Sequence, residues 1–383
     1  LLGFGVLIPL IPFYAVRLGL SAEWVTPVIA LHSLMQFVGA PLLGRLSDRY
    51  GRRPVLALSM AGHVAAYVLL AFSDSLAWLI ASRLLSGFTS GNLSAAYAYV
   101  SDVTPVERRA TSLARISAAF ALGFAIGPAL GGWLAGAADP VSANLASPAL
   151  MAAALSTLAL VGILAFLPES HVGTRRSANA AMAREKPSAR IAALRDPALR
   201  LMVILCLCVL TFAAMRESLM SLWLHDRLAY DTHAIGMVFT INGFTVAFAQ
   251  FVLVGPLARQ FGEMVTLRAG VVCYGISWAG LLLAHDLPSV LSATAIGAFG
   301  TALFGTSLQT LVSLRAAPTT RGAIMGTYQS SSSLARFSGA ASSGTLYGQL
   351  GRDVPFLFGA VAMLPALLIT LRIGSVLRQE AKA

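Results

Sequence analysis

Two apolar runs with a dense charge cluster between them constrain this chain more than any other feature. The runs, Trp24–Leu43 and Pro54–Phe72, are each about long enough to cross the roughly 30 Å hydrocarbon core of a bilayer as a helix. The stretch between them reads G-R-L-S-D-R-Y-G-R-R-P and carries Arg45, Asp48, Arg49, Arg52 and Arg53. Such a cluster must lie in water at one membrane face. Because positive loops are retained inside during insertion, the arginines predict the cytoplasmic face.

The same stretch has the residues of a tight, switchable turn. Gly44 and Gly51 allow a sharp reversal, and Asp48 offers a carboxylate that can cap a helix or pair with a guanidinium. The pattern resembles the loop between helices two and three of the major facilitator superfamily. An ordinary positive-inside loop would explain the arginines but neither the glycines nor Asp48. We therefore expect a conformational gate made by Gly44, Asp48, Arg49, Gly51, Arg52, Arg53, Asp102 and Arg108.

Composition also indicates an integral membrane protein. The chain is 57% apolar and 11% charged, with a mean hydropathy of +0.76, which excludes a soluble domain of ordinary makeup. A net charge of +11 would suit a nucleic-acid partner, but all but six of the 27 Lys and Arg fall on the side assigned to the cytoplasm, so we expect none. Three cysteines in apolar runs argue against disulfides and metal sites. The sequence is already apolar at Leu1, so the first helix is expected to be truncated.

The hydrophobic pattern predicts an all-α membrane protein with twelve transmembrane helices in two pseudo-symmetric six-helix bundles. The expected spans are 1–17, 24–44, 54–73, 77–102, 110–137, 147–167, 199–225, 232–255, 264–284, 288–314, 323–349 and 354–373. Residues 168–198 are rich in charge and lack the hydrophobic period, which predicts a cytoplasmic linker with a short surface helix near 188–194. The linker would separate an N-terminal bundle, 1–167, from a C-terminal bundle, 199–383. An even helix count places both termini in the cytoplasm.

The two halves resemble each other. Gly255 to Glu263 repeats Gly44 to Arg52 from glycine to glycine, with the charges lost or inverted. Likewise Pro318 to Arg321 echoes Pro105 to Arg108. Two related bundles predict a cavity near the bilayer midplane and alternating access by rocking one bundle against the other.

The fourth span carries an unusual charge. Arg83 lies early in this apolar helix, where a lone arginine is costly unless it has a cavity or a partner; the alternative is that it snorkels to the outer surface. Asp102 ends the same helix and is expected to close a charge network with Arg52 and Asp48. If it only neutralises Arg108 or the next arginine, that role disappears.

The fifth span reads G-x-x-x-G-P-x-x-G-G and contains Gly123, Gly127, Pro128, Gly131 and Gly132. Glycines spaced by four residues lie on one face, where helices can approach closely, and the proline leaves a backbone carbonyl without its helical donor. The full string resembles the signature that marks antiporters within the superfamily. Together with Gly3 to Pro12 and Arg83 to Gly87, it makes the N-terminal half similar to the twelve-helix drug:proton antiporters. Tetracycline exporters and their relatives look most similar among these, a likeness that continues through Gln250 to Gly262 and Leu308-Gln309.

That resemblance implies proton-driven export of small amphipathic compounds across a bacterial inner membrane. One position departs from it and one cannot be read. The histidine that tetracycline exporters tend to carry in helix eight is Val246 here, and the acid that commonly lies three positions before the Gly-x-Gly of the first helix would fall just before Leu1. The resemblance therefore predicts the class of transporter but does not identify the drug that it carries.

Proton coupling requires a titratable group inside the membrane. Glu217 is the acid that falls well inside a span, and Arg216 and Arg336 are its candidate partners. Protonation of Glu217 would neutralise it and change which bundle arrangement is favoured; the alternative is a static pair that orients helix seven. Arg83 and His32 complete the expected coupling set, although membrane histidines such as His32 and His63 can also be hydrogen-bonded packing residues.

Small polar groups near mid-span suit a loosely held amphipathic compound, and each could instead be an interhelical hydrogen bond. The candidates for substrate contact are Gln36, Asn92, Asn242, Gln309, Tyr328 and Gln329. The sequence has no phosphate-binding loop and no H-E-x-x-H or G-x-S-x-G motif, so we expect no enzyme, no metal and no cofactor. We expect a monomer. The competing functions are a lipid or lysolipid translocator of the same fold and a transport-inactive sensor or scaffold.

Overall fold

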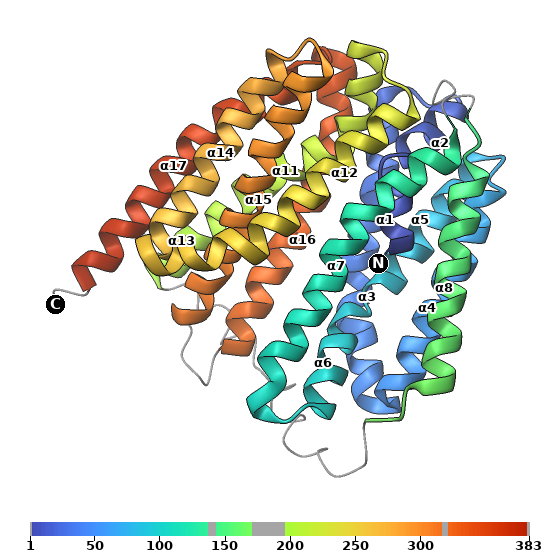
Figure 1. Ribbon diagram of the computed structural model, residues 1–383, viewed down its shortest axis with the longest axis horizontal. Helices are drawn as coiled ribbons and strands as arrows, with labels where there is room; N and C mark the ends of the chain where they lie inside the picture. Colours follow the sequence, from blue (N-terminus) through green and yellow to red (C-terminus); the bar gives the residue numbers. More distant parts are fainter. Residues whose placement is uncertain (1, 137–142, 171–195, 316–320, 381–383) are drawn as a thin grey trace. The chain divides into compact units, whose positions relative to one another are not determined.

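The computed structural model describes residues 2–136, 143–170, 196–315 and 321–380 (Figure 1). Within these ranges the chain is almost entirely helical and has no β-strand, which confirms the expected fold class. The first elements are α1 (Leu2–Leu7), α2 (Ile11–Arg17), α3 (Ala22–Tyr50), α4 (Arg52–Ala71), α5 (Leu76–Ser90), α6 (Leu93–Val103), α7 (Val106–Ala135) and α8 (Ala146–Phe166). The later ones are α11 (Pro197–Leu228), α12 (Thr232–Phe248), η1 (Ala249–Leu253), α13 (Val254–Phe261), α14 (Glu263–Leu282), α15 (Leu287–Arg315), α16 (Arg321–Thr345), η2 (Leu346–Leu350) and α17 (Val354–Glu380), where η marks a π-helical turn.

In the described part of the chain, eight helical segments are long and apolar enough to cross a membrane. The other expected spans correspond to α1–α2, α5–α6, α7 and α16. Most of the expected linker, with its short surface helix, lies outside the described residues.

Two spans that the sequence predicted as single helices are interrupted. In the first, α1 and α2 are separated at residues 8–10, where Pro9 cannot donate a backbone hydrogen bond. In the fourth, α5 ends at Ser90 and α6 begins at Leu93. At Gly91 and Asn92 between them, ψ is −7° and −10°, which tightens the helix locally.

The turn at the charge cluster is shorter than predicted. We expected a loop from Gly44 to Pro54, but α3 continues to Tyr50 and α4 begins at Arg52, so Gly44 is an ordinary helical residue. The buried face of the helix also continues past Gly44, because Ser47, one turn beyond Leu43, is buried and accepts a hydrogen bond from Arg52. Gly51 alone makes the reversal, with φ of +107° that other residues rarely adopt.

The internal repeat is visible in the backbone of the second half. Gly262 joins α13 to α14 as a single residue with φ of +82° and ψ of 156°, close to the +107° and 158° of Gly51. The two glycine-centred turns that the sequence aligned therefore share one geometry.

By its internal contacts the chain divides into two compact units. The first unit comprises Leu1–Val172, Ser218–Phe244 and Ala340–Leu350, and the second comprises Gly173–Glu217, Thr245–Gly339 and Gly351–Ala383. The first unit holds the expected N-terminal bundle together with two segments of the C-terminal one, and the second unit holds the rest of the C-terminal bundle, so the predicted boundaries at 168 and 199 stay a prediction.

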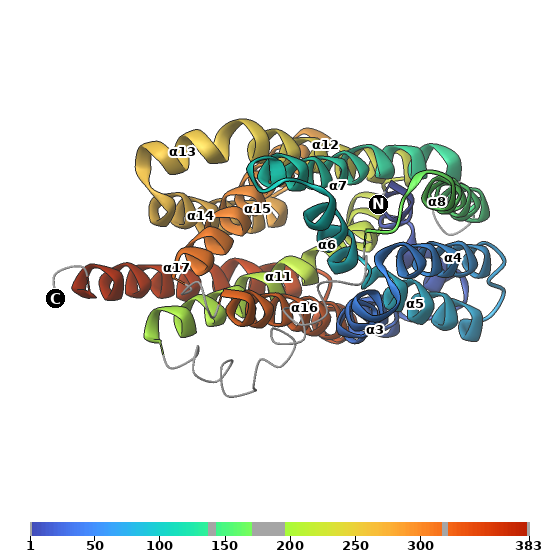
Figure 2. The same ribbon diagram turned by 90° about the horizontal axis from the view of Figure 1, so that it is seen from below.

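Within each unit, neighbouring helices pack side by side over long stretches. In the first unit α4 lies along α8 and α3 along α5; in the second, α14 lies along both α15 and α17 (Figures 1 and 2). The largest buried side chains of the second unit are aromatic, and Trp278 on α14 meets Phe356 on α17 edge to face. These packed helix pairs hold the charged residues described next.

Candidate functional site

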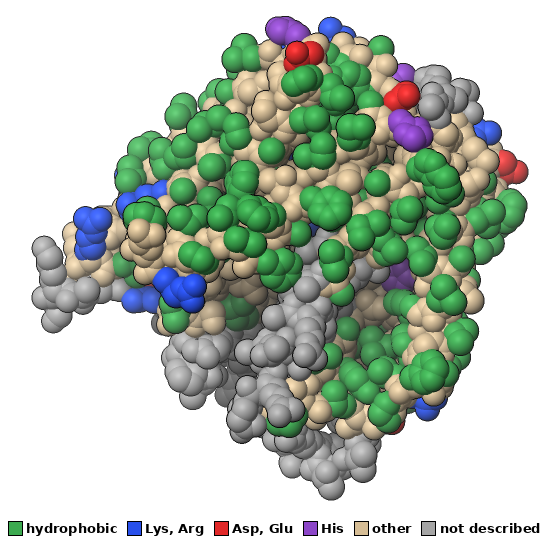
Figure 3. Space-filling view, in the orientation of Figure 1, with side chains coloured by type: hydrophobic (Ala, Val, Ile, Leu, Met, Phe, Trp, Pro, Cys, Tyr) green, Lys and Arg blue, Asp and Glu red, His purple; other side chains and the backbone are tan. Residues whose placement is uncertain are grey.

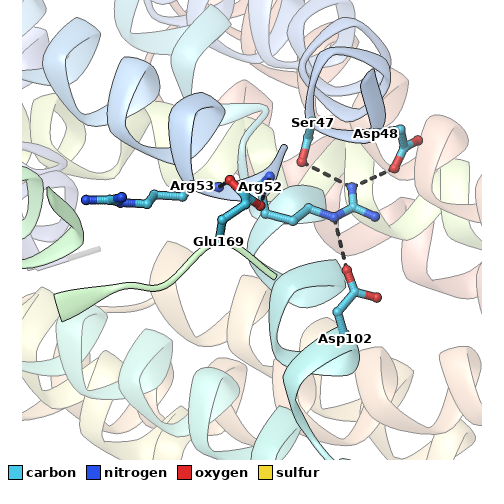
Figure 4. A network of polar contacts seen from close by, with 6 residues as sticks. All are labelled: Ser47, Asp48, Arg52, Arg53, Asp102 and Glu169. Atoms are coloured by element: carbon cyan, nitrogen blue, oxygen red, sulfur yellow. Dashed lines mark hydrogen bonds and ion pairs between the residues drawn. The ribbon is translucent and has the colours of Figure 1, made fainter. Parts of the chain in front are cut away.

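Arg52 is the centre of a charge network in the first unit (Figure 4). Its side chain is 6% exposed, and Nη1 lies 2.6 Å from Asp48 Oδ1, one turn back across the Gly51 turn. Nη1 also donates to Ser47 Oγ at 3.1 Å, and Nε donates to Asp102 Oδ2 at 3.3 Å. The expected contacts of Arg52 with Asp48 and Asp102 are therefore present, and they join α3, α4 and α6.

Glu169 completes this network and was not among the residues predicted for the gate. Its carboxylate accepts from the backbone N–H of Arg52 at 2.9 Å and of Arg53 at 3.2 Å. Gly51 provides no side-chain cap for α4, so the first N–H groups need an acceptor from elsewhere, and an anion is favoured at a helix N-terminus. A signal was available: an acid directly after α8, the helix that lies along α4.

The other expected gate residues lie apart from Arg52. Arg53 points away from it in Figure 4 and donates through Nη2 to the carbonyl of Leu164 at 2.5 Å. The Arg49 guanidinium sits 5.2 Å from the centre of the Tyr50 ring. The side chain of Arg108 lies outside the described residues.

Three glycines of the antiporter-like string pack α7 onto α1. A Cβ added at Gly127 would overlap the backbone of Gly5, and one at Gly131 would overlap the carbonyl of Val6. Gly123 also contacts α1, because a Cβ added at Gly5 would overlap the Gly123 carbonyl. The close helix approach predicted from the four-residue spacing is present.

The rest of the string packs α7 onto α12, also in the first unit. Gly132 contacts Gly236, whose own Cβ position faces the Pro128 carbonyl. The Phe124 carbonyl, to which Pro128 has no N–H to donate, lies against Gly243. Glycines on both helices thus allow backbone-to-backbone contact around the proline.

Arg83 is buried rather than snorkelling to the surface, so that alternative is wrong. It is 1% exposed, Nη2 donates to Ser82 Oγ at 3.3 Å, and Nε is buried without a hydrogen-bond partner among the described residues. None of the described carboxylates lies within 4.0 Å of it. An uncompensated cation therefore sits inside the first unit.

His32 has the contacts of the packing alternative. It is buried, Nδ1 lies 3.1 Å from Ser86 Oγ, and the ring stacks on Phe4 with centroids 5.0 Å apart. His63 likewise uses both ring nitrogens, toward the Ser59 carbonyl and Ser90 Oγ.

Arg216 and Glu217 point in different directions from α11, as adjacent helical residues do. The Arg216 guanidinium lies inside the second unit, where Nη1 donates to Ser277 Oγ at 3.1 Å and Cζ is 5.8 Å from the centre of the Tyr274 ring. Glu217 is exposed and forms no ion pair with a described arginine. Arg336 is also exposed, so the expected pairing of Glu217 with Arg216 or Arg336 is absent.

The expected substrate contacts differ in accessibility. Gln309 and Gln329 are exposed, Gln36, Asn92 and Asn242 are half-buried, and Tyr328 is 7% exposed. The amides thus keep accessible surface, whereas Tyr328 is buried within the second unit.

Comparison with known proteins agrees with this arrangement. The family model described as Major Facilitator Superfamily matches residues 1–231 and 205–382. The chain belongs to the major facilitator superfamily.

Among its relatives, this superfamily member is 32% identical to the tetracycline resistance protein, class G, of Vibrio anguillarum over 90% of the chain and 87% of that protein. It is also 32% identical to the class C protein of Escherichia coli, over 74% and 70% of the two chains. The crystal structure of the human organic anion transporter MFSD10 matches with a TM-score of 0.68 at 25% identity, covering 96% of this chain and 95% of that one. The superfamily member is therefore a multi-pass membrane transporter and not an enzyme.

Proposed function

We propose that this transporter is a proton-coupled antiporter that exports small amphipathic organic compounds from a bacterial cell by alternating access. The observation that carries the proposal is the packing of α7, where the antiporter-like glycines bring its backbone against α1 and α12. Similarity to two tetracycline resistance proteins supports export as the direction of transport.

Glu217 is the proposed proton acceptor. Its carboxylate is exposed within an apolar helix and lacks a cationic partner among the described residues, so binding a proton or a cationic group there breaks no ion pair. The adjacent Arg216 donates to Ser277 Oγ in the interior of the second unit and does not pair with this carboxylate.

The Arg52 network is the proposed gate. It ties α3, α4 and α6 together through side chains, and the ion pairs can break without unfolding a helix. We assign this face and both termini to the cytoplasm because the arginines cluster there.

The substrate is proposed to be an amphipathic compound with an aromatic or fused-ring body, held by amides such as Gln309, Gln329 and Asn242. The similarity to tetracycline resistance proteins suggests tetracyclines as the first compounds to test, and the similarity to MFSD10 suggests organic anions as the second.

The test uses the purified transporter in proteoliposomes that report internal pH. When a pH gradient is present, we expect added tetracyclines or organic anions to make protons cross the vesicle membrane, which is seen as a change in internal pH. Glu217→Gln should abolish proton movement but keep gradient-independent exchange of substrate, while Gln329→Ala should weaken substrate affinity and keep coupling. Full proton-driven transport by Glu217→Gln would contradict the coupling role, and movement of labelled phospholipid instead of drug would favour a lipid translocator.

A further inference from the structure

Arg336 is an exposed cation in the middle of a membrane span. It lies at the middle of the helical segment that α16 and η2 form together, residues 321–350. On the face of the protein in Figure 3, most basic side chains lie near the ends of helices, and hydrophobic side chains cover much of the surface between them. A guanidinium at mid-span is costly unless it has a partner, a water-filled space or a ligand.

The position of Arg336 around α16 is that of an inward-facing residue. Successive helical residues turn by about 100°, so three buried residues lie within about 40° of Arg336 around the axis: Ser332, Ala340 and Ser343. Leu334, an apolar side chain that is 54% exposed, lies about 160° away, on the other side of the helix. Arg336 therefore projects from the face of α16 that is otherwise buried in protein.

The residues near the Arg336 guanidinium belong to the interior of the second unit. Cys206 on α11, Tyr274 on α14 and Tyr328 on α16 are all buried, and the guanidinium is near enough to act electrostatically on each of them. A side chain that pointed away from the protein would not approach both α11 and α14. The exposed surface of Arg336 is thus on the interior side of this unit.

This positive charge has no partner among the described residues. Neither an ion pair nor a hydrogen bond joins the Arg336 side chain to another described residue. Apart from Glu217, the described acids of the second unit lie at helix ends or in turns: Asp196, Glu263, Asp286 and Asp353. Arg216 adds a second positive charge in the interior. Two arginines and one carboxylate leave this mid-span region with an excess of positive charge.

Polar groups continue from Arg336 along the same face of α16. Gln329 lies seven positions earlier, which is about 20° around the helix and about 10 Å along its axis, and it is also exposed. Ser333 lies between them, and its hydroxyl donates to the Gln329 carbonyl. The Gln329 amide and the Arg336 guanidinium are therefore two accessible donors on one face, at a separation that an elongated organic molecule can span.

We propose that Arg336 binds the acidic group of the transported compound, so that the substrates are amphipathic organic anions. The inference rests on the proposed export function and names the charge of its substrate. A carboxylate accepts two parallel hydrogen bonds from one guanidinium, and such charge-assisted bonds are stronger than neutral ones. The Gln329 amide then binds a carbonyl or hydroxyl at the other end of the compound. An ammonium in place of the carboxylate would be repelled by Arg336.

The test compares three compounds that share one ring system. Naphthalene-2-acetate, its methyl ester and 2-(naphthalen-2-yl)ethylamine supply an anion, a neutral molecule and a cation. Equilibrium binding of each radiolabelled compound is measured on the purified transporter in lipid nanodiscs, and empty nanodiscs correct for partition into lipid. We expect the anion to bind about ten-fold tighter than the ester or the amine. Arg336→Gln should weaken anion binding about ten-fold, the effect of losing a hydrogen bond to a charged group, and should leave ester binding unchanged.

Matched variants separate recognition by Arg336 from general charge and from folding. Arg372→Gln removes an exposed arginine from α17 of the same unit and should leave all three affinities unchanged. Arg336→Lys should keep part of the preference for the anion, because it keeps the charge but not the paired hydrogen bonds. Since the Arg336 side chain is exposed and has no described partner, Arg336→Gln should unfold at the same temperature as the unmodified protein.

Equal affinities for the anion and the ester, or an equal loss of both in Arg336→Gln, would overturn the proposal. Binding in nanodiscs needs no pH gradient, so this result is independent of proton coupling. If the anion binds through Arg336 but moves no protons in proteoliposomes, the proposed antiport is wrong and the assignment of Arg336 stands.

Discussion

The guanidinium of Arg216 occupies the space that a side chain at Gly297 would need. A Cβ on Gly297 would overlap both Arg216 Nη1 and Ser277 Oγ, the two groups that hydrogen-bond to each other. Arg216 on α11 is thus accommodated by a missing side chain on α15 and a hydroxyl on α14. The Arg216 guanidinium can therefore occupy this position only because residue 297 has no side chain.

Gly297→Ala should destabilise the protein by about 1–3 kcal/mol, the usual cost of overpacking a full interior. Gly305→Ala on the same helix meets open space and should be neutral or stabilising by up to about 1 kcal/mol, because alanine favours helix. Thermal unfolding in detergent compares them. If Arg216 is the obstacle, adding Arg216→Met to Gly297→Ala should recover stability; equal destabilisation by both glycine variants would rule out the explanation.

Arg52 and Asp102 should be energetically coupled. We expect Arg52→Gln and Asp102→Asn each to lower the free energy of unfolding. The double variant should lose about 0.5–3 kcal/mol less than the sum of the two single losses, because either change alone already breaks the ion pair. Chemical unfolding in detergent gives the four free energies. Arg45→Gln with Asp102→Asn serves as the control and should be additive; additivity in the Arg52 cycle would show that the pair contributes nothing.

Alanine at Gly51 should be worse than alanine at Gly262. Both glycines combine positive φ with ψ of 156–158°, a backbone region essentially restricted to glycine, so both substitutions carry backbone strain of about 1–3 kcal/mol. At Gly51 the new Cβ would also collide with the Glu169 carboxylate, whereas at Gly262 it meets nothing. The free energy of unfolding should therefore be lower for Gly51→Ala than for Gly262→Ala. The difference should shrink when Glu169→Ala is added, and an unchanged gap would mean that the collision is relieved at no cost.

Asp196 should make stability depend on acid pH. Burial acts to raise the pKa of Asp196, but the Arg315 hydrogen bond at 2.6 Å and the backbone N–H groups of Ala198 and Leu199 outweigh it, so the pKa lies below its ordinary value. A lowered folded-state pKa stabilises the protein above the unfolded pKa of about 4, and the stabilisation is lost as pH falls through the folded value.

Asp196→Asn isolates this charge effect, because asparagine still caps the start of α11. We expect its melting temperature to lie below that of the unmodified protein at neutral pH and to converge with it below about pH 4. A constant difference across this range would show that the charge of Asp196 has no part in stability.

The sequence predicted features that depend on local pattern. Hydrophobic length placed the spans, and the four-residue spacing of glycines predicted the close approach of α7 to α1. The contacts among Arg52, Asp48 and Asp102 followed from two charged turns expected at the same membrane face.

Features that depend on which helices become neighbours were not predictable in the same way. Glu169 lies 117 positions from Arg52, and its role appears only once α8 lies along α4. Arg216 was predicted as a partner of Glu217 on charge alone, whereas a hydroxyl, an aromatic ring and the space beside Gly297 surround its guanidinium. Gly44 was assigned to the turn because glycine permits one, but burial of Ser47 extended the helix past it.

The prolines of the first unit leave backbone carbonyls without their usual helical donors. Pro9 and Pro128 take away the helical donors of the Gly5 and Phe124 carbonyls, and both carbonyl-bearing segments lie where α1, α7 and α12 meet. These backbone acceptors persist whatever side chain occupies their residue. Only a change at the proline itself would return the missing N–H and close the helical hydrogen bond, so Pro9 and Pro128 decide which parts of the α1 and α7 backbone are free to accept from a neighbour.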